Sequence, residues 1–321
     1  MIPSIVLAPL AGGPSTPELA AAVSNAGGLG FVAAGYLTAD ELARRIARTR
    51  ELTDAPIGVN LFALTETPVD EQAIARYADE LGTEARALGV ELGEPRFDDD
   101  ELDAKLDVVV DAKVEVVSLT FGFPAAVAAR LENVWATVTS VTEARAAHGL
   151  GAHALVVQGA EAGGHRGTWH DSDDETPLLP LLREIAAVVD LPLVAAGGIA
   201  TRDTVAAALD AGAVAVQPGT AFLLAPEAGT SEPHRRALAA DGWTGMTRAF
   251  TGRNARGIVN RFMRDHPDAP SAYPQIHHLT APLRAAARTA GDEGGINLWA
   301  GVAFEHTVAR PAAETVAALR P

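Results

Sequence analysis

The residues from Leu193 to Thr220 read LVAAGGIATRDTVAAALDAGAVAVQPGT, and this stretch decides the fold. A short apolar run, Leu193–Ala196, is followed by a glycine turn, an Ala-rich segment and a second apolar run, Ala213–Gln217. Neither run alternates with polar residues, which is typical of parallel strands buried on both faces. The pattern predicts a strand–helix–strand unit with a glycine-containing loop after each strand.

The same unit recurs along most of the chain. A helix is expected to begin at Pro17, and Thr38 is expected to cap a helix that begins near Ala39. Eight such units predict an α/β fold, the (β/α)₈ TIM barrel. An open doubly wound sheet is the alternative, but no G-x-G-x-x-G follows any strand and no G-x-x-x-x-G-K occurs. The expected strands are Ser4–Ala8, Gly28–Ala34, Ile57–Phe62, Val116–Thr120, Val134–Val138, Ala154–Gln158, Leu193–Ala196 and Ala213–Gln217.

Two stretches interrupt this rhythm. From about residue 66 to residue 112 the chain carries a long helical pattern, Val69 to Leu88, and then the acidic segment Phe97–Asp103. Everything after Phe222 reads as mostly helical with loops. We therefore expect a barrel over residues 1–222 with a helical excursion at 66–112. Residues 223–321 are expected to pack over the barrel mouth as a mostly helical lid.

Composition narrows the class of protein. The 321 residues carry a net charge of −16, which disfavours binding to nucleic acid or to anionic membrane surfaces. The chain has no cysteine, which excludes disulfides and thiolate chemistry. The apolar start of the chain has no basic leader and is far shorter than the roughly 20 residues that span a bilayer. A soluble, cytoplasmic protein is expected, and its oligomeric state is left open.

The loop after the strand Ala154–Gln158 contains the first candidate for chemistry. It reads Gln158-Gly-Ala-Glu-Ala-Gly-Gly-His165 and ends a barrel strand, where active sites of this fold lie. Glycine lets the backbone turn sharply and approach a flat ligand closely. The imidazole of His165 can accept a proton near neutral pH, so it is the candidate base. The alternative is a loop histidine with a packing role alone.

Two further loops predict a phosphate site. Gly197 and Gly198 follow the seventh strand, and Gln217-Pro218-Gly219-Thr220 follows the eighth, where barrels commonly bind phosphate. Lysine occurs only at positions 105 and 113, so backbone N–H groups are the expected ligands. Pro218 has no N–H, so Gly219 and Thr220 must donate. The alternative is that both loops are ordinary starts of helices.

Two amides at strand ends suggest what kind of ring is bound. Asn60 lies within an apolar strand and Gln158 ends another, and buried amides must find partners. A flavin's pyrimidine edge, with alternating carbonyl and N–H groups, suits the donors and acceptors of an amide. Satisfying nearby backbone is the alternative for each of them.

Other polar clusters carry weaker signals. The acidic run His170–Glu175 lacks the spacing of a calcium loop and reads as an acidic surface loop. His277 and His278 are adjacent and have no evident third ligand, so no metal is expected. The set Arg253, Asn254 and Arg256 is a candidate to meet an anionic group over the site, and a solvated turn is the alternative.

Three of these stretches, Gln158–Arg166, Ala195–Ile199 and Gln217–Thr220, together resemble the flavin-dependent nitronate monooxygenases. The pattern Q-G-x-E-A-G-G-H is the most specific element, and the resemblance runs from Ile2 to about Gly301. Weaker similarity is found at Pro3–Leu10, Gly58–Phe62, Phe121–Pro124 and Tyr273–Ala287. The chain departs from the family pattern at Leu10, which is often Met, at Pro218, and at Val302–Glu305, where many relatives have a Gln-Gly pair.

The resemblance implies an FMN at the barrel mouth and His165 as the active-site base. It implies oxidation of alkyl nitronates, and in some members neutral nitroalkanes, with O₂ and without NAD(P)H, to a carbonyl compound and nitrite. Two rivals remain: an FMN-dependent enoyl-thioester reductase that uses NAD(P)H, and a non-redox barrel that binds a phosphorylated metabolite. The residues expected to contact FMN are Ala8, Leu10, Asn60, Gln158, Gly163, Gly164, Gly197, Gly198, Gln217, Pro218, Gly219 and Thr220.

Overall fold

A closed parallel barrel forms the larger part of the molecule. The structure, a computed structural model, describes residues 2–321. Seven strands pair in parallel in the order β1-β2-β3-β4-β5-β7-β8. Residues 4–7 close the ring, because Ile5 pairs with Val216 of β8 and Val6 pairs with Leu29 beside β1. The expected TIM barrel is thus confirmed. The strands are β1 (Gly30–Ala33), β2 (Ile57–Phe62), β3 (Val116–Thr120), β4 (Val134–Val138), β5 (Ala154–Gln158), β7 (Leu193–Ala196) and β8 (Ala215–Val216).

The strands are apolar throughout because both of their faces are buried. Phe31, Trp135 and Val156 belong to a cluster of inward-facing residues. Neighbouring strand residues pack outward against the helices. Gly58 is required for this inner packing, since a Cβ there would lie 2.5 Å from the ring of Phe31.

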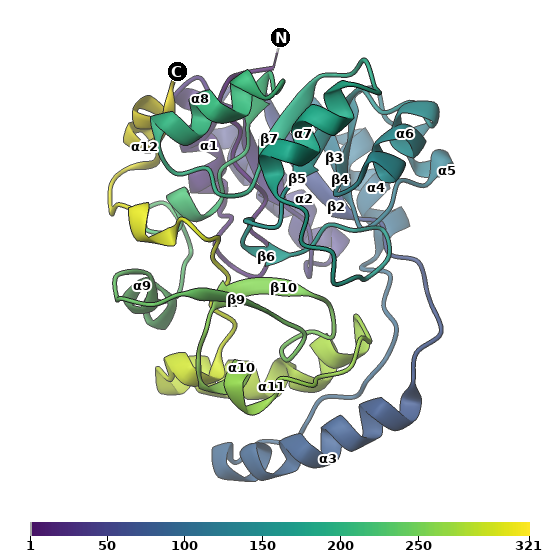
Figure 1. Ribbon diagram of the computed structural model, residues 1–321, viewed down its shortest axis with the longest axis vertical. Helices are drawn as coiled ribbons and strands as arrows, with labels where there is room; N and C mark the ends of the chain where they lie inside the picture. The colour runs from purple at the N-terminus through teal and green to yellow at the C-terminus, as the bar shows by residue number, and fades with distance from the viewer. Residues whose placement is uncertain (1) are drawn as a thin grey trace.

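Helices surround the barrel, and the last of them comes from the end of the chain (Figure 1). Capping side chains start several of them; Thr38, for example, accepts a hydrogen bond from the N–H of Glu41. α12 packs between α1 and α8, in the place of a helix directly after β8. The surrounding helices are α1 (Pro17–Asn25), α2 (Ala39–Leu52), α4 (Leu102–Asp111), α5 (Ala125–Ala128), α6 (Val141–Gly149), α7 (Leu178–Ala186), α8 (Arg202–Asp210) and α12 (Ala312–Leu319).

A second layer, here called the lid, consists of residues 223–311 together with α3 (Glu71–Leu88). Its own apolar cluster joins Tyr77 and Leu81 of α3 to Phe250, Phe262 and Leu279. α3 lies beside α11, at the end of the molecule away from the barrel helices (Figure 1). The other elements of the lid are α9 (Glu232–Leu238), α10 (Arg261–Asp265), α11 (Gln275–Ala290) and the short 3₁₀ turns η2 (Glu293–Gly295) and η3 (Phe304–His306). A further 3₁₀ turn, η1 (Thr220–Phe222), follows β8 just before the lid.

The lid contains strands that the sequence does not predict. β9 (Thr244–Thr247) and β10 (Ala255–Ile258) pair with β6 (Gly164–His165) in a small antiparallel sheet of order β6-β10-β9. In Figure 1 this sheet lies between the barrel and α10 and α11. Residues after 222 are therefore not all helix and loop, and α12 packs on the barrel instead of on the lid. The division of the chain at residue 222 stays a prediction. No helix within residues 2–321 combines the length and the apolar character needed to cross a bilayer.

Candidate active site

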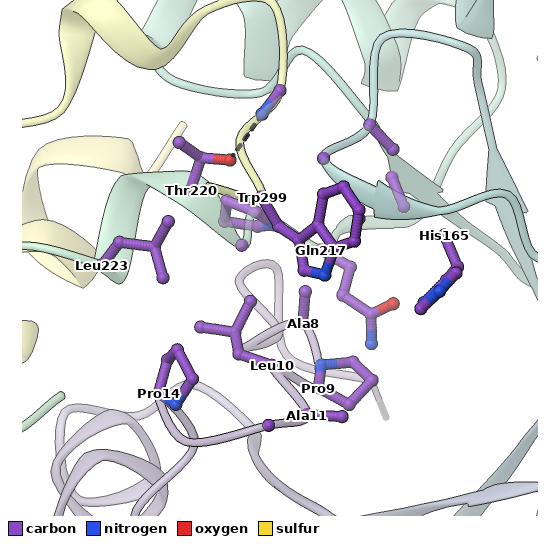
Figure 2. A pocket seen from close by; sticks show the side chains of 18 of the residues that line it. Ala8, Pro9, Leu10, Ala11, Pro14, His165, Gln217, Thr220, Leu223 and Trp299 are labelled. Carbon is purple, nitrogen blue, oxygen red and sulfur yellow. Dashed lines mark hydrogen bonds between the residues drawn. The ribbon is translucent and has the colours of Figure 1, made fainter. Parts of the chain in front are cut away.

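A cavity of about 360 Å³ lies between the lid and the carboxyl ends of the strands. Figure 2 shows several of its side chains, with the amide of Gln217 pointing toward the space beside His165. The structure brings His165 and all of the residues expected to contact FMN to the lining of this cavity, although what each contacts there stays a prediction. They are Ala8, Leu10, Asn60, Gln158, Gly163, Gly164, His165, Gly197, Gly198, Gln217, Pro218, Gly219 and Thr220.

The glycines of the wall serve two purposes. Gly197 and Gly198 have φ values of +117° and +67°, which favour glycine and leave their backbone open to the cavity. Gly163 instead permits close contact with the lid, because a Cβ there would lie 2.5 Å from the nitrogen of Gly301. That nitrogen donates to the hydroxyl of Thr220 over 3.0 Å, the dashed line of Figure 2.

The three amides that belong to the barrel side of the cavity differ in what they leave free. Gln158 donates to the carbonyl of His165 over 3.1 Å and accepts from the N–H of Gly167 over 2.8 Å, so it holds its own loop together. Asn60 donates to the Ser118 hydroxyl over 2.9 Å. Gln217 is 4% exposed, and its Nε2 has no partner among residues 2–321. It is a buried donor that faces a cavity, and such a donor needs an acceptor from a ligand.

His165 is enclosed by rings and by positive charge. Its β6 backbone pairs with Ala255 of β10, which fixes the imidazole at the edge of the cavity. The ring centroids of Tyr273, Trp299 and Phe121 lie 5.3, 5.6 and 6.0 Å away. Burial, and then the charge of Arg253 and of Arg284, lowers the pKa of His165 to about 3. The imidazole is therefore neutral at pH 7 and keeps one nitrogen with a lone pair, while the same burial and charges make it a weaker base than a free histidine.

Arg253 and Arg256 are buried, so the expectation of a solvated turn is wrong for both. The guanidinium of Arg253 lies 4.2 Å above the ring of Phe121 and donates to the carbonyls of Arg166 and Thr168. Arg256 donates to the carbonyl of Ala160 over 2.8 Å. All three partners lie more than 80 residues earlier in the chain, so no local pattern indicates the contacts. The two arginines tie the lid to the loop that carries His165.

The acidic run His170–Glu175 also connects barrel and lid. Asp171 accepts hydrogen bonds from the Nε of Arg248 over 2.8 Å and from the Ser271 hydroxyl over 2.6 Å. Its side chain is only 13% exposed, whereas that of Asp173 is 82% exposed. The run is thus a surface loop held to the lid by the largely buried Asp171 and also by Glu175, which accepts from Arg256 over 3.1 Å. Within residues 2–321 no group of three or more His, Cys, Asp or Glu side chains is placed to hold a metal ion.

Sequence reasoning missed the aromatic part of the site. Tyr36, Phe62, Phe121 and Trp299 line the cavity. Tyr36 and Phe121 follow β1 and β3 directly, so the rule that barrel sites lie at strand ends could have found them. Trp299 lies in the lid and gives no such signal. Burial raises the pKa of Tyr36 to about 12, so its phenol stays protonated and shares a hydrogen bond of 3.1 Å with the hydroxyl of Tyr273.

A buried ion pair supports Tyr36 from below. The backbone N–H of Tyr36 donates to Asp100 over 2.8 Å, and Asp100 lies 2.7 Å from the amine of Lys105. The Lys105 side chain is only 1% exposed. Burial raises the pKa of Asp100 to about 6, although Lys105 opposes the shift. The excursion between β2 and α4 therefore shapes one wall of the site.

A closed parallel barrel with a polar cavity and a neutral imidazole at the strand ends defines a barrel enzyme that acts on a small molecule. A family described as nitronate monooxygenase matches residues 1–320. The chain belongs to this family, which confirms the resemblance seen in the sequence. It is therefore an oxidoreductase, a monooxygenase of the flavoprotein class.

Individual relatives agree with this assignment. A probable nitronate monooxygenase of Staphylococcus aureus (strain Newman) is 36% identical over 315 residues, which cover 94% of this chain and 88% of the relative. A solved nitroalkane oxidase from Streptomyces ansochromogenes is 49% identical, with a TM-score of 0.95 over 98% of this chain and 94% of its own. FabK from Thermotoga maritima is more distant, at 26% identity and a TM-score of 0.77 over 98% of this chain and 91% of its own.

Proposed function

We propose that the protein binds FMN in this cavity and uses O₂ to oxidise alkyl nitronates, and neutral nitroalkanes, to a carbonyl compound and nitrite. The observation that carries the proposal is the placement of His165. A neutral imidazole at the cavity edge, enclosed by aromatic rings, suits removal of a proton from carbon. The positive charges of Arg253 and Arg284 lower the pKa of His165. The same charges would stabilise the negative charge of a bound nitronate.

The residues of the cavity fit an FMN. The unpartnered Nε2 of Gln217 is a donor for a carbonyl or ring nitrogen of the isoalloxazine. Gly198 and Gly219 would hold the phosphate with backbone N–H groups, as expected for the loops after β7 and β8. When bound, FMN supplies the redox chemistry, taking electrons from the nitronate and passing them to O₂.

The protein's own residues prepare the substrate. With a neutral nitroalkane, His165 takes the α-proton, and the electron pair of the broken C–H bond moves into the C=N bond of the nitronate. A substrate supplied as nitronate needs no such step. The rings of Phe121 and Trp299 bring apolar surface beside the imidazole and exclude water from it.

The proposal is tested by anaerobic titration of the purified, flavin-loaded protein with propionate 3-nitronate, followed by visible absorbance. The flavin bands are expected to change on titration and to recover in air. A flavin that stays oxidised with nitronate but bleaches with NADPH would favour the enoyl-thioester reductase. Protein that takes up no flavin, even after reconstitution, would favour the non-redox barrel.

The role of His165 has its own test, the substitution His165→Asn. Loss of the base should lower kcat/KM for a neutral nitroalkane by about 100-fold to 10,000-fold, because no other group takes the proton. The loss with the corresponding nitronate should be far smaller. Steady-state oxygen consumption with both substrates measures the difference, and equal losses for the two substrates would exclude the base.

A further inference from the structure

Thr251, in the lid, contacts the imidazole of His165. It is 2% exposed and does not line the cavity. Its Oγ1 lies 2.9 Å from the Nε2 of His165. The other ring nitrogen, Nδ1, forms no hydrogen bond with any residue in the 2–321 range. One nitrogen is therefore held by the protein, and the other is free for a substrate.

Which nitrogen carries the proton decides what His165 can do. A neutral imidazole has one N–H, and only its other nitrogen can accept a proton. If Nε2 carries the hydrogen, the lone pair is on Nδ1, the nitrogen without a protein partner, and His165 can act there as a base. If Nδ1 carries the hydrogen, Nδ1 is a hydrogen-bond donor instead. A threonine hydroxyl is compatible with either arrangement, since it both donates and accepts.

The surroundings of Thr251 favour the first arrangement. Its Oγ1 lies 3.3 Å from the carbonyl oxygen of Arg253, and no other donor to this carbonyl is found in the described part of the chain. Arg253 is a buried residue, and a buried carbonyl without a donor costs about 1–3 kcal/mol. We therefore assign the hydroxyl hydrogen of Thr251 to the bond with the Arg253 carbonyl. This leaves Oγ1 to accept from Nε2–H of His165 and, over 3.4 Å, from the N–H of Arg253.

We infer that Thr251 is a positioning residue that fixes the proton of His165 on Nε2 and so leaves Nδ1 as the base. The inference rests on the proposed function. In the reaction the substrate Cα–H bond breaks, the proton goes to Nδ1, and the electron pair forms the C=N bond of the nitronate. The hydrogen bond from Nε2–H of His165 to the Thr251 hydroxyl stays in place throughout. The imidazole therefore does not turn when it becomes charged.

The proton position is measured by NMR of the flavin-loaded protein labelled with ¹⁵N-histidine, with the His165→Asn variant identifying the signal. The expected spectrum shows His165 with a protonated Nε2 and an unprotonated Nδ1. In Thr251→Val, which removes the hydroxyl but keeps the shape, the form protonated on Nδ1 should increase. A parent protein whose His165 is protonated on Nδ1 overturns the inference, whatever its activity.

Kinetics supply a second readout. Thr251→Val should lower kcat for a neutral nitroalkane by roughly 10-fold or more and affect the nitronate far less, because only the first needs the base. Thr251→Ser, which restores the hydroxyl, should recover most of the loss. Equal losses with both substrates, or no recovery with serine, would contradict the positioning role. A parent without nitronate turnover would instead defeat the proposed function, while the NMR result would still decide the proton position.

Discussion

Asp171 is predicted to anchor the lid, and Asp171→Asn tests this. The carboxylate accepts from Arg248, from Ser271 and from the N–H of Asn254, over 2.8, 2.6 and 3.1 Å. Hydrogen bonds to a charged group contribute about 1.5–3 kcal/mol each, and they are not additive. Because the asparagine keeps the shape and part of the accepting capacity, we expect the free energy of unfolding to fall by about 2–4 kcal/mol.

The pH dependence of this loss follows from the pKa of Asp171. Burial alone would raise it, but the hydrogen bonds from Ser271, Arg248 and Asn254 outweigh burial and lower the pKa. A lowered folded-state pKa gives stability that is present above the ordinary value of about 3.9 and is lost as the pH falls through the folded-state pKa. The difference in the free energy of unfolding between parent and variant should thus be at its maximum at pH 7 and should shrink below about pH 4.

Urea unfolding, monitored at several pH values, measures this difference. The matched control is Asp173→Asn, because Asp173 binds the same Arg248 over 2.8 Å but is 82% exposed. An exposed pair contributes about 0–1 kcal/mol, so this variant should unfold close to the parent. Equal effects of the two substitutions, or a loss at Asp171 that persists unchanged at pH 3, would refute the reasoning.

Gly163→Ala should displace the histidine loop, since the added Cβ would lie 2.5 Å from the nitrogen of Gly301. We expect loss of most bound flavin, measured as flavin absorbance per protein, whereas Gly82→Ala on α3 should keep the flavin and gain about 0.5–1 kcal/mol. Lys105→Met should leave Asp100 as a buried unpaired charge and cost about 3–5 kcal/mol at pH 7. Burial raises the pKa of Asp100 to about 6 while Lys105 opposes the shift, so removing Lys105 should raise this pKa further. The variant's extra cost should therefore be present only at higher pH and should already diminish as the pH falls toward about 6; a difference in urea midpoint that does not depend on pH would contradict this.

The barrel, and the part of the site formed by its strand ends and the loops that follow them, can be predicted from the sequence because they depend on local patterns. Strands buried on both faces leave unbroken apolar runs, as at Ile57–Phe62, which forms β2 with the same bounds. Glycine turns after strands point to ligand loops, and His165 is the one imidazole among them. The position of a residue at a strand end therefore indicates its chemical role from the order of amino acids alone.

The part of the site formed by the lid depends on contacts between residues that are distant in sequence, and these contacts leave no local signal. β9 and β10 are four residues each; they pair with each other, and β10 also pairs with β6 and, through Gly257, with Trp299. A short polar strand such as Thr244–Thr247 has neither a long apolar run nor clear alternation. Thr251, likewise, is one threonine in a glycine-containing turn until folding places it against His165, 86 residues earlier.

The position of α12 has a consequence for how the protein is made. α12 packs against α1 and α8, yet the ribosome synthesises it only after the whole of residues 223–311. The faces of α1 and α8 that it covers stay exposed until then, although Leu19 and Val205 belong to the same apolar cluster as Val316. The contact between α1 and α12 closes a loop of nearly 300 residues. Contacts between residues so distant in sequence form slowly. Nascent chains that end after the lid but before α12 should therefore expose an apolar surface on α1 and α8 and engage chaperones there.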